Sequence, residues 1–69
     1  PNPCTDHINL LGTSSGNTVN IYNLSGNEIL QTSSDFENTR IDIKNIPAGF
    51  YLINYSGKDR RLNLKIFKQ

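Results

Sequence analysis

Cys4, Asp6 and His7 lie close together near the start of the sequence, and their side chains are of types that bind metal ions. A zinc site needs several such ligands in a fixed geometry. The sequence has one cysteine and one histidine in total. An incidental cysteine and a surface histidine therefore explain the cluster more simply. We predict no metal site and no cofactor, and the roles of Cys4 and His7 stay open.

Enzymatic catalysis has equally few candidate residues. His7 is the only histidine, and no serine stands in a G-x-S-x-G motif. The acidic residues fall at turns or at outward positions of the expected strands, where a solvated surface explains them. A chain of 69 residues also leaves little room for an enclosed cleft. We predict that the protein is not an enzyme.

The net charge of +1 hides an uneven distribution. Residues 58–69 hold five basic side chains and one acidic one, whereas residues 1–57 hold two basic and five acidic ones. Such asymmetry can steer an anionic partner, but lysines that protect a sheet edge also explain it, and from charge alone we prefer that interpretation. Phe67 and the tyrosines could stack on bases. The charge is too low and no nucleic-acid-binding motif is present, so we predict no nucleic-acid partner.

Length and segment composition limit the organisation of the chain. Its 69 residues predict one domain, and its single cysteine cannot form an internal disulfide. No segment approaches the roughly 20 apolar residues that span a membrane, so we predict no direct membrane insertion. The opening residues, PNPCTDHINLLG, lack the basic and apolar regions of a signal peptide. We interpret residues 1–5 as linker-like and residues 1–69 as a C-terminal domain cut from a longer secreted protein.

Apolar residues recur at every second position between short turns, which is typical of β-strands. No window has the apolar stripe of a helix. Gly26 and Asn27 tolerate positive φ, so they predict a hairpin. Pro47 fits the second position of a type I turn, and Gly49 fits the fourth. The sequence predicts a loop at residues 34–39 and strands at residues 7–11, 18–24, 28–33, 40–46, 50–55 and 60–68.

The segment FYLINY, residues 50–55, is apolar on both of its faces. Tyr51, Ile53 and Tyr55 share one face, and Phe50 and Leu52 share the other. Such a strand is usually central in its sheet. We also expect most of the tyrosines and phenylalanines to lie in the core. The pattern predicts an all-β protein, a small antiparallel immunoglobulin-like β-sandwich of about six to seven strands.

Four segments follow one another in the order PNP, VNIYNLSGNEIL, RIDIKNIPAGFYLINY and LNLKIFKQ, and together they cover nearly the whole chain. In this order they resemble the type A C-terminal sorting domain of the bacterial type IX secretion system, also called the Por secretion system. Members carry a Tyr-Asp-Leu-x-Gly-like hairpin, an I-x-L…L-x-x-G-x-Y-x-V run and a short last strand closing on lysine. The matching positions here are Tyr22, Asn23, Leu24 and Gly26; Ile41, Ile43, Ile46, Gly49, Tyr51 and Ile53; and Lys65, Ile66, Phe67 and Lys68. This sequence departs from the pattern at Asn23, where Asp is common, and at Gln69, which follows the last lysine.

The resemblance implies a non-catalytic secretion signal. Such a domain passes through the periplasm with its cargo, is recognised by the type IX outer-membrane translocon, and directs the cargo to the cell surface or the extracellular space. A sortase-like protease commonly removes it near its N-terminal boundary. Recognition would use the last strand, by strand addition at an exposed edge or by charge pairing through Lys65 and Lys68. The residues expected to present this signal are Lys65, Ile66, Phe67, Lys68 and Gln69, and those expected to shape the domain are Gly26, Pro47, Gly49, Tyr51 and Ile53.

Two other interpretations belong to different functional classes. A carbohydrate-binding or adhesion module at the C-terminus of a secreted enzyme would share the sandwich fold. It would usually expose aromatic residues, often tryptophan, on a flat face, and this sequence has no tryptophan. A structural immunoglobulin-like spacer would have no reason to keep a basic, lysine-ended last strand. Weak self-association through an edge strand stays open.

Overall fold

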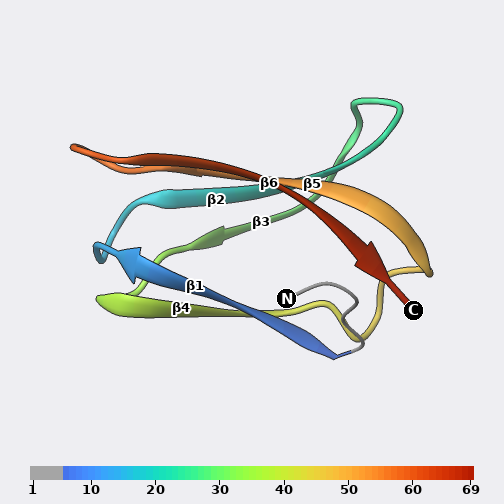
Figure 1. The fold of residues 1–69 in the computed structure, drawn as a ribbon, viewed down its shortest axis with the longest axis horizontal. Helices are drawn as coiled ribbons and strands as arrows, with labels where there is room; N and C mark the ends of the chain where they lie inside the picture. The colour runs from blue at the N-terminus through green and yellow to red at the C-terminus, as the bar shows by residue number, and fades with distance from the viewer. Residues whose placement is uncertain (1–5) are drawn as a thin grey trace.

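The computed structural model describes residues 6–69, in which six antiparallel strands form two sheets that pack face to face (Figure 1). One sheet has the order β3-β2-β5-β6, and the other pairs β1 with β4. The predicted all-β, immunoglobulin-like sandwich is confirmed, and residues 1–5 lie outside the described part of the chain. No helix long and apolar enough to cross a membrane occurs in residues 6–69. The strands are β1 (His7–Thr13), β2 (Thr18–Asn23), β3 (Glu28–Ser33), β4 (Glu37–Asp42), β5 (Gly49–Ser56) and β6 (Arg61–Lys68).

The core fills the space between the two sheets, and alternate residues of each strand supply it. Successive side chains of a strand point to opposite faces, so the period-two pattern of the sequence becomes a buried face and an outer face. Figure 1 shows the β1–β4 pair as one layer below β2, β5 and β6. The buried apolar residues are Ile8, Leu10, Val19, Ile21, Ile41, Ile43, Tyr51, Ile53, Tyr55 and Ile66.

Strand β5 is central, as its sequence predicts. It pairs antiparallel with β2 on one side and with β6 on the other. Its register places Ile21, Ile53 and Leu64 in one row across the three strands. Tyr51 and Tyr55 belong to the same inner face and are buried, whereas Phe50 and Leu52 point outward and are 47% and 42% exposed. The outer face of β5 therefore carries apolar side chains that the second sheet does not cover.

The predicted loop at residues 34–39 is wrong for its second half. Strand β4 begins at Glu37, and its first residues pair with the end of β1, with Leu10 opposite Thr39. Thr39 is buried, and its hydroxyl lies 2.7 Å from the hydroxyl of Thr13. Glu37 and Asn38 have weak strand propensity, so the local sequence does not predict a strand here. The long-range bond to Thr13 and the pairing with β1 compensate for this weak propensity.

The turn between β4 and β5 also differs from the prediction. The hydrogen-bonded turn spans residues 43–46, where the amide of Ile46 donates to the carbonyl of Ile43 at 3.3 Å. The observed turn therefore ends before Pro47, whereas the predicted turn has Pro47 as its second residue. Gly49 is the first residue of β5 and has a φ of +146°. A side chain at this φ is strained, so glycine suits the entry to the strand.

The hairpin between β2 and β3 forms where Gly26 and Asn27 predict it. The amide of Gly26 donates to the carbonyl of Asn23 at 3.0 Å, and the amide of Asn23 donates to the carbonyl of Asn27 at 3.0 Å. The side-chain oxygen of Asn23 accepts bonds from the amides of Ser25 and Asn27, each at 3.0 Å. Asparagine in place of the aspartate common in this motif therefore still supplies the oxygen acceptor that organises the turn.

Candidate functional site

The residues expected to carry the recognition signal, Lys65 to Gln69, divide between the two faces of β6. Ile66 is buried in the core, and Lys68 is 9% exposed. Lys65 and Gln69 are exposed, and Phe67 is half-buried. Five consecutive residues cannot all face a partner because a strand alternates its side chains. On the outer face and at the end of the strand, this set offers Lys65, Phe67 and Gln69.

Lys68 occupies an inner-face position at the margin of the core. It pairs with Gly49, and its ammonium nitrogen lies 3.5 Å from the backbone carbonyl of Lys44. Its long apolar stem covers the end of the core while the charged group reaches a backbone acceptor. Charge pairing of Lys68 with a partner would have to break this arrangement, whereas Lys65 is exposed.

Two phenylalanines and a lysine form a compact group on the outer face of β5 and β6. Phe50 pairs directly with Phe67, and their ring centroids are 4.9 Å apart with a 45° angle between the planes. The ammonium of Lys65 lies 4.9 Å from the centroid of the Phe50 ring. Both spacings fall within the ranges of favourable aromatic and cation–π contacts. The three side chains are therefore held in a fixed relation on the surface.

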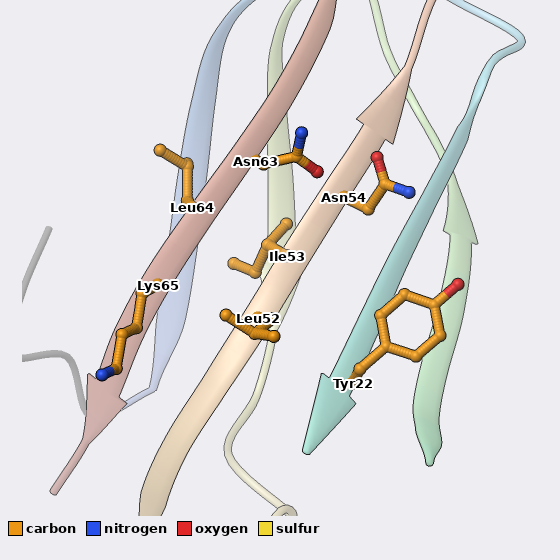
Figure 2. Close-up of a pocket in the computed structure, with 7 residues that line it drawn as sticks. All are labelled: Tyr22, Leu52, Ile53, Asn54, Asn63, Leu64 and Lys65. Carbon is orange, nitrogen blue, oxygen red and sulfur yellow. The ribbon is translucent and has the colours of Figure 1, made fainter. Parts of the chain in front are cut away.

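An open pocket of about 450 Å³ lies on the same sheet beside this group. Figure 2 shows Tyr22, Leu52 and Lys65 around it, on the adjacent strands β2, β5 and β6. Leu52 pairs with Tyr22 on one side and with Lys65 on the other. Asn54 and Asn63 are cross-strand partners, and their side-chain amides form a polar margin of the pocket. The pocket could receive an apolar side chain flanked by hydrogen-bonding or acidic groups.

We call the outer-face residues Tyr22, Phe50, Leu52, Lys65 and Phe67 the outer patch. The expectation that most aromatic residues lie in the core is wrong for the phenylalanines: Phe36 is 73% exposed, Phe50 is 47% exposed and Phe67 is half-buried. The sequence contains a signal for this patch, because FYLINY is apolar on both faces and only one of them meets the second sheet. We missed it by assigning both faces to the interior.

The residues expected to shape the domain lie where the chain enters its central strand or turns. The hydroxyl of Tyr51 donates a hydrogen bond of 2.6 Å to the carbonyl of Pro47. Gly49 lies between them with its positive φ, and Ile53 is buried one strand repeat later. Gly26, with a φ of +91°, belongs to the separate β2–β3 hairpin. Neither Tyr51 nor Ile53 reaches the outer patch through its side chain, because both face the core.

A hydrogen-bonded network closes one end of the sandwich. The hydroxyl of Tyr55 accepts bonds from the amide of Ser14 at 2.8 Å and from the side chain of Asn17 at 3.2 Å. The hydroxyl of Ser34 donates to the carbonyl of Ser14 and accepts from the amide of Asn17. The backbone bond from Ser14 lowers the pKa of Tyr55 below 10.0, against the opposing effect of burial and with a smaller contribution from Asn17. The network ties the β1–β2 connection to β5 and holds the fold rather than a ligand.

The metal-ligand candidates do not form a site within residues 6–69, where no group of three or more histidine, cysteine, aspartate or glutamate side chains is placed to hold an ion. His7 is half-buried at the start of β1, and Asp6 is exposed. The backbone carbonyl of Asp6 accepts a bond of 2.9 Å from the amide of Ile43, so its placement has a structural reason. Cys4 lies outside the described residues.

Comparison with known protein families gives a match over the whole chain. The family described as the secretion system C-terminal sorting domain matches residues 1–69, the whole chain. No curated protein and no solved structure gives a significant match. The match covers both the sandwich and the segment that precedes it.

Proposed function

Because the chain belongs to the family of secretion system C-terminal sorting domains, we propose that it is a non-catalytic address signal read by the outer-membrane translocon of the type IX system. Membership in the family supports a C-terminal sorting signal for type IX secretion. It implies interaction with the type IX machinery and export across the outer membrane to the cell surface or the extracellular space. The match to residues 1–69 is the observation that carries the proposal.

The finer steps of the route are part of the same proposal. The cargo crosses the periplasm before the translocon engages the folded domain, and a sortase-like protease then cuts near the N-terminal boundary of the domain. Residues 1–69 act as a single unit in this route, with residues 1–5 as the link to the cargo. The chain itself supplies recognition and carries out no chemistry, which is consistent with a family of sorting signals.

We propose that the translocon recognises the exposed side chains of the last strand rather than all five residues from Lys65 to Gln69. Lys65 and Gln69 are exposed, whereas Ile66 and Lys68 are buried and support the fold. A buried side chain influences recognition by holding the strand in place. Deletion of the whole strand would remove Ile66 from the core and unfold a small domain, so point substitutions separate the two roles better.

An export assay tests the proposed function. Residues 1–69 are fused behind a signal peptide and a fluorescent reporter that folds in the periplasm, in a host with a working type IX system and in a translocon-deficient strain. The host's own sorting domain in the same arrangement is the positive control. We expect surface or secreted reporter in the first strain only. Reporter retained in the periplasm of both strains, with the fusion folded and the positive control exported, would contradict the proposal and favour an adhesion or spacer module.

A further inference from the structure

We propose that the outer patch is the surface on which this domain docks to the type IX machinery, and that its partner there is a protein segment with an apolar side chain flanked by a carboxylate. The inference rests on the proposed function and adds to it a location and a partner chemistry. In this proposal the partner binds mainly to the outer face of β2, β5 and β6, and not mainly to the last residues of the chain. Tyr22, Phe50, Leu52, Lys65 and Phe67 form this surface.

The outer face of this sheet carries apolar side chains where a two-layer sandwich normally has polar ones. An antiparallel sheet with one solvated face usually alternates apolar inward and polar outward residues. Here Phe50 and Leu52 are outward on the central strand and 47% and 42% exposed. Their cross-strand neighbours, Phe67 and Tyr22, are half-buried on the same face. Contiguous exposed apolar residues rimmed by polar ones mark interaction sites.

The outer patch is also positively charged. The strands β5 and β6 carry Arg61 and Lys65 on this face and contain no aspartate or glutamate along their whole lengths. Glu28 of β3 pairs with Tyr22 at the margin of the patch, and its carboxylate accepts a hydrogen bond of 2.6 Å from the side chain of Asn20. A partner that places an acidic group beside Lys65 would therefore meet the net positive charge of β5 and β6, and such complementarity sets specificity and association rate.

The side chains of the outer patch are preorganised for binding. Phe50 contacts the Phe67 ring, at 4.9 Å between centroids, and the Lys65 ammonium, at 4.9 Å from the Phe50 ring centroid. All three residues stand on regularly paired strands, since β5 and β6 pair without a register shift over their full length. Rigid aromatic side chains lose little conformational entropy on binding. The open pocket beside Leu52 offers a recess for the partner's apolar side chain.

A second copy of this chain fits the patch less well. Two copies meeting through β5 and β6 would bring Arg61 and Lys65 of each onto a surface of the other that has no carboxylate on these strands. Like charges opposed across an interface are unfavourable. We therefore assign the patch to an acidic partner of another kind, and dimerisation through the patch is an outcome that would contradict the assignment.

The first experiment measures export of the reporter fusion with substitutions in the patch and with matched controls elsewhere. The patch variants are Phe50→Thr, Leu52→Thr and Lys65→Glu. Their controls change the same residue types at exposed positions away from the patch: Phe36→Thr, Leu11→Thr and Lys58→Glu. Thermal unfolding of each purified fusion establishes that it is folded. We expect each patch variant to lower export at least about fivefold, as truncation of interface anchors does, and each control to change it less than twofold.

Lys65→Arg separates charge from shape. Arginine keeps the positive charge and the contact with the Phe50 ring, so we expect export near that of the unchanged domain. Loss of export in Lys65→Glu with retention in Lys65→Arg supports an acidic partner. Equal export from both would overturn the charge assignment.

The outcomes distinguish this inference from the proposed function. If the unchanged domain is exported and the folded patch variants are exported equally well, the patch inference is wrong and the sorting function stands. If the unchanged domain is not exported, the sorting function itself fails. For variants that do not fold, a photo-crosslinking phenylalanine analogue at position 50 gives a second readout. We expect an adduct with a component of the type IX machinery, identified by mass spectrometry and absent from the translocon-deficient strain, and an adduct with a second copy of the domain alone would overturn the inference.

Discussion

The hydroxyl of Tyr51 donates a hydrogen bond of 2.6 Å to the backbone carbonyl of Pro47, four residues earlier in the chain. Tyr51 is buried near the start of the central strand β5, and Pro47 lies in the exposed connection that leads to it. The bond resembles the tyrosine corner of immunoglobulin domains, in which a tyrosine near a strand start bonds to the backbone a few residues upstream. It fixes the chain at its entry into the sheet, which explains why proline, glycine and tyrosine stand so close together.

Tyr51→Phe tests this corner. The substitution keeps the ring in the core and removes only the hydroxyl, so we expect the free energy of unfolding to fall by about 0.5–1.5 kcal/mol, the usual net value of one hydrogen bond. Urea denaturation measures the change. Tyr22→Phe is the matched control, because Tyr22 is half-buried and its hydroxyl makes no hydrogen bond within residues 6–69. An equal loss in both variants would show that the corner contributes nothing specific.

Gly49→Ala tests the strand entry. Gly49 has a φ of +146°, and an added Cβ would meet no atom within 4 Å, so the cost arises from the backbone alone. We expect a loss of about 1–3 kcal/mol in the free energy of unfolding, the range for a residue held in a sparsely populated backbone conformation. Gly16→Asn provides the comparison, since Gly16 has a φ of +81° in open space, where asparagine is tolerated. Unchanged stability in Gly49→Ala would show that the strand entry relaxes without cost.

The sequence was sufficient to predict six strands and the inward residues of several of them, although not the start of β4 at Glu37. Period-two alternation determines which residues share a face, so Ile41 and Ile43 were predictable as core residues and are buried. The hairpin at Gly26 was predictable because its turn residues act locally. The first residues of β4 were not predictable as strand, because Thr39 joins the sheet through β1 and the Thr13 hydroxyl, which are distant in the sequence.

The candidate site was less predictable because alternation does not reveal whether a second layer covers a face. Phe50 and Leu52 were correctly placed opposite Tyr51, but only the structure shows that the second sheet does not cover them. The position of Lys68 could have been inferred, because it has the same parity as Leu62, Leu64 and Ile66. We overlooked this by treating the basic residues of the last strand as one group.

The pH dependence of Tyr55 gives a third prediction. The amide of Ser14, at 2.8 Å from the hydroxyl, stabilises the phenolate and lowers the pKa of Tyr55 below 10.0. A spectrophotometric titration of phenol ionisation, compared with that of Tyr55→Phe, should therefore assign to Tyr55 a transition below the ordinary tyrosine value. A transition at or above that value would show that burial outweighs the hydrogen bonds.

The same shift predicts a sign for stability. A group whose pKa is lower in the folded state than in the unfolded state releases its proton more readily when folded, so its ionisation favours folding as the pH rises. We expect the unfolding free energy of the unchanged protein, minus that of Tyr55→Phe, to increase as the pH rises through the folded-state pKa. The increase should be complete above the unfolded-state value near 10.0. A difference that shrinks with rising pH would contradict the assignment, and the subtraction removes the effects of the lysines common to both proteins.

Lys68 tests whether a basic residue of the last strand acts through the fold or through a partner. Its side chain is 9% exposed, and its ammonium reaches the carbonyl of Lys44 at 3.5 Å. Lys68→Met keeps a long apolar stem, so we expect a change of less than about 1.5 kcal/mol in the free energy of unfolding, as for other volume-conserving exchanges. Lys68→Glu brings a carboxylate to the same carbonyl, and we expect a loss of about 2 kcal/mol or more because neither oxygen acceptor then has a donor.

Export of the reporter fused to Lys68→Met completes this test. If Lys68 acts only through the fold, the folded Lys68→Met domain should be exported as well as the unchanged one, although it lacks the charge. Lys65→Met at the neighbouring outward position is the matched control, and its export should fall because Lys65 faces the outer patch. Loss of export in folded Lys68→Met, with stability unchanged, would mean that the Lys68 ammonium leaves the Lys44 carbonyl to bind a partner, and the buried lysine would then belong to the recognition surface.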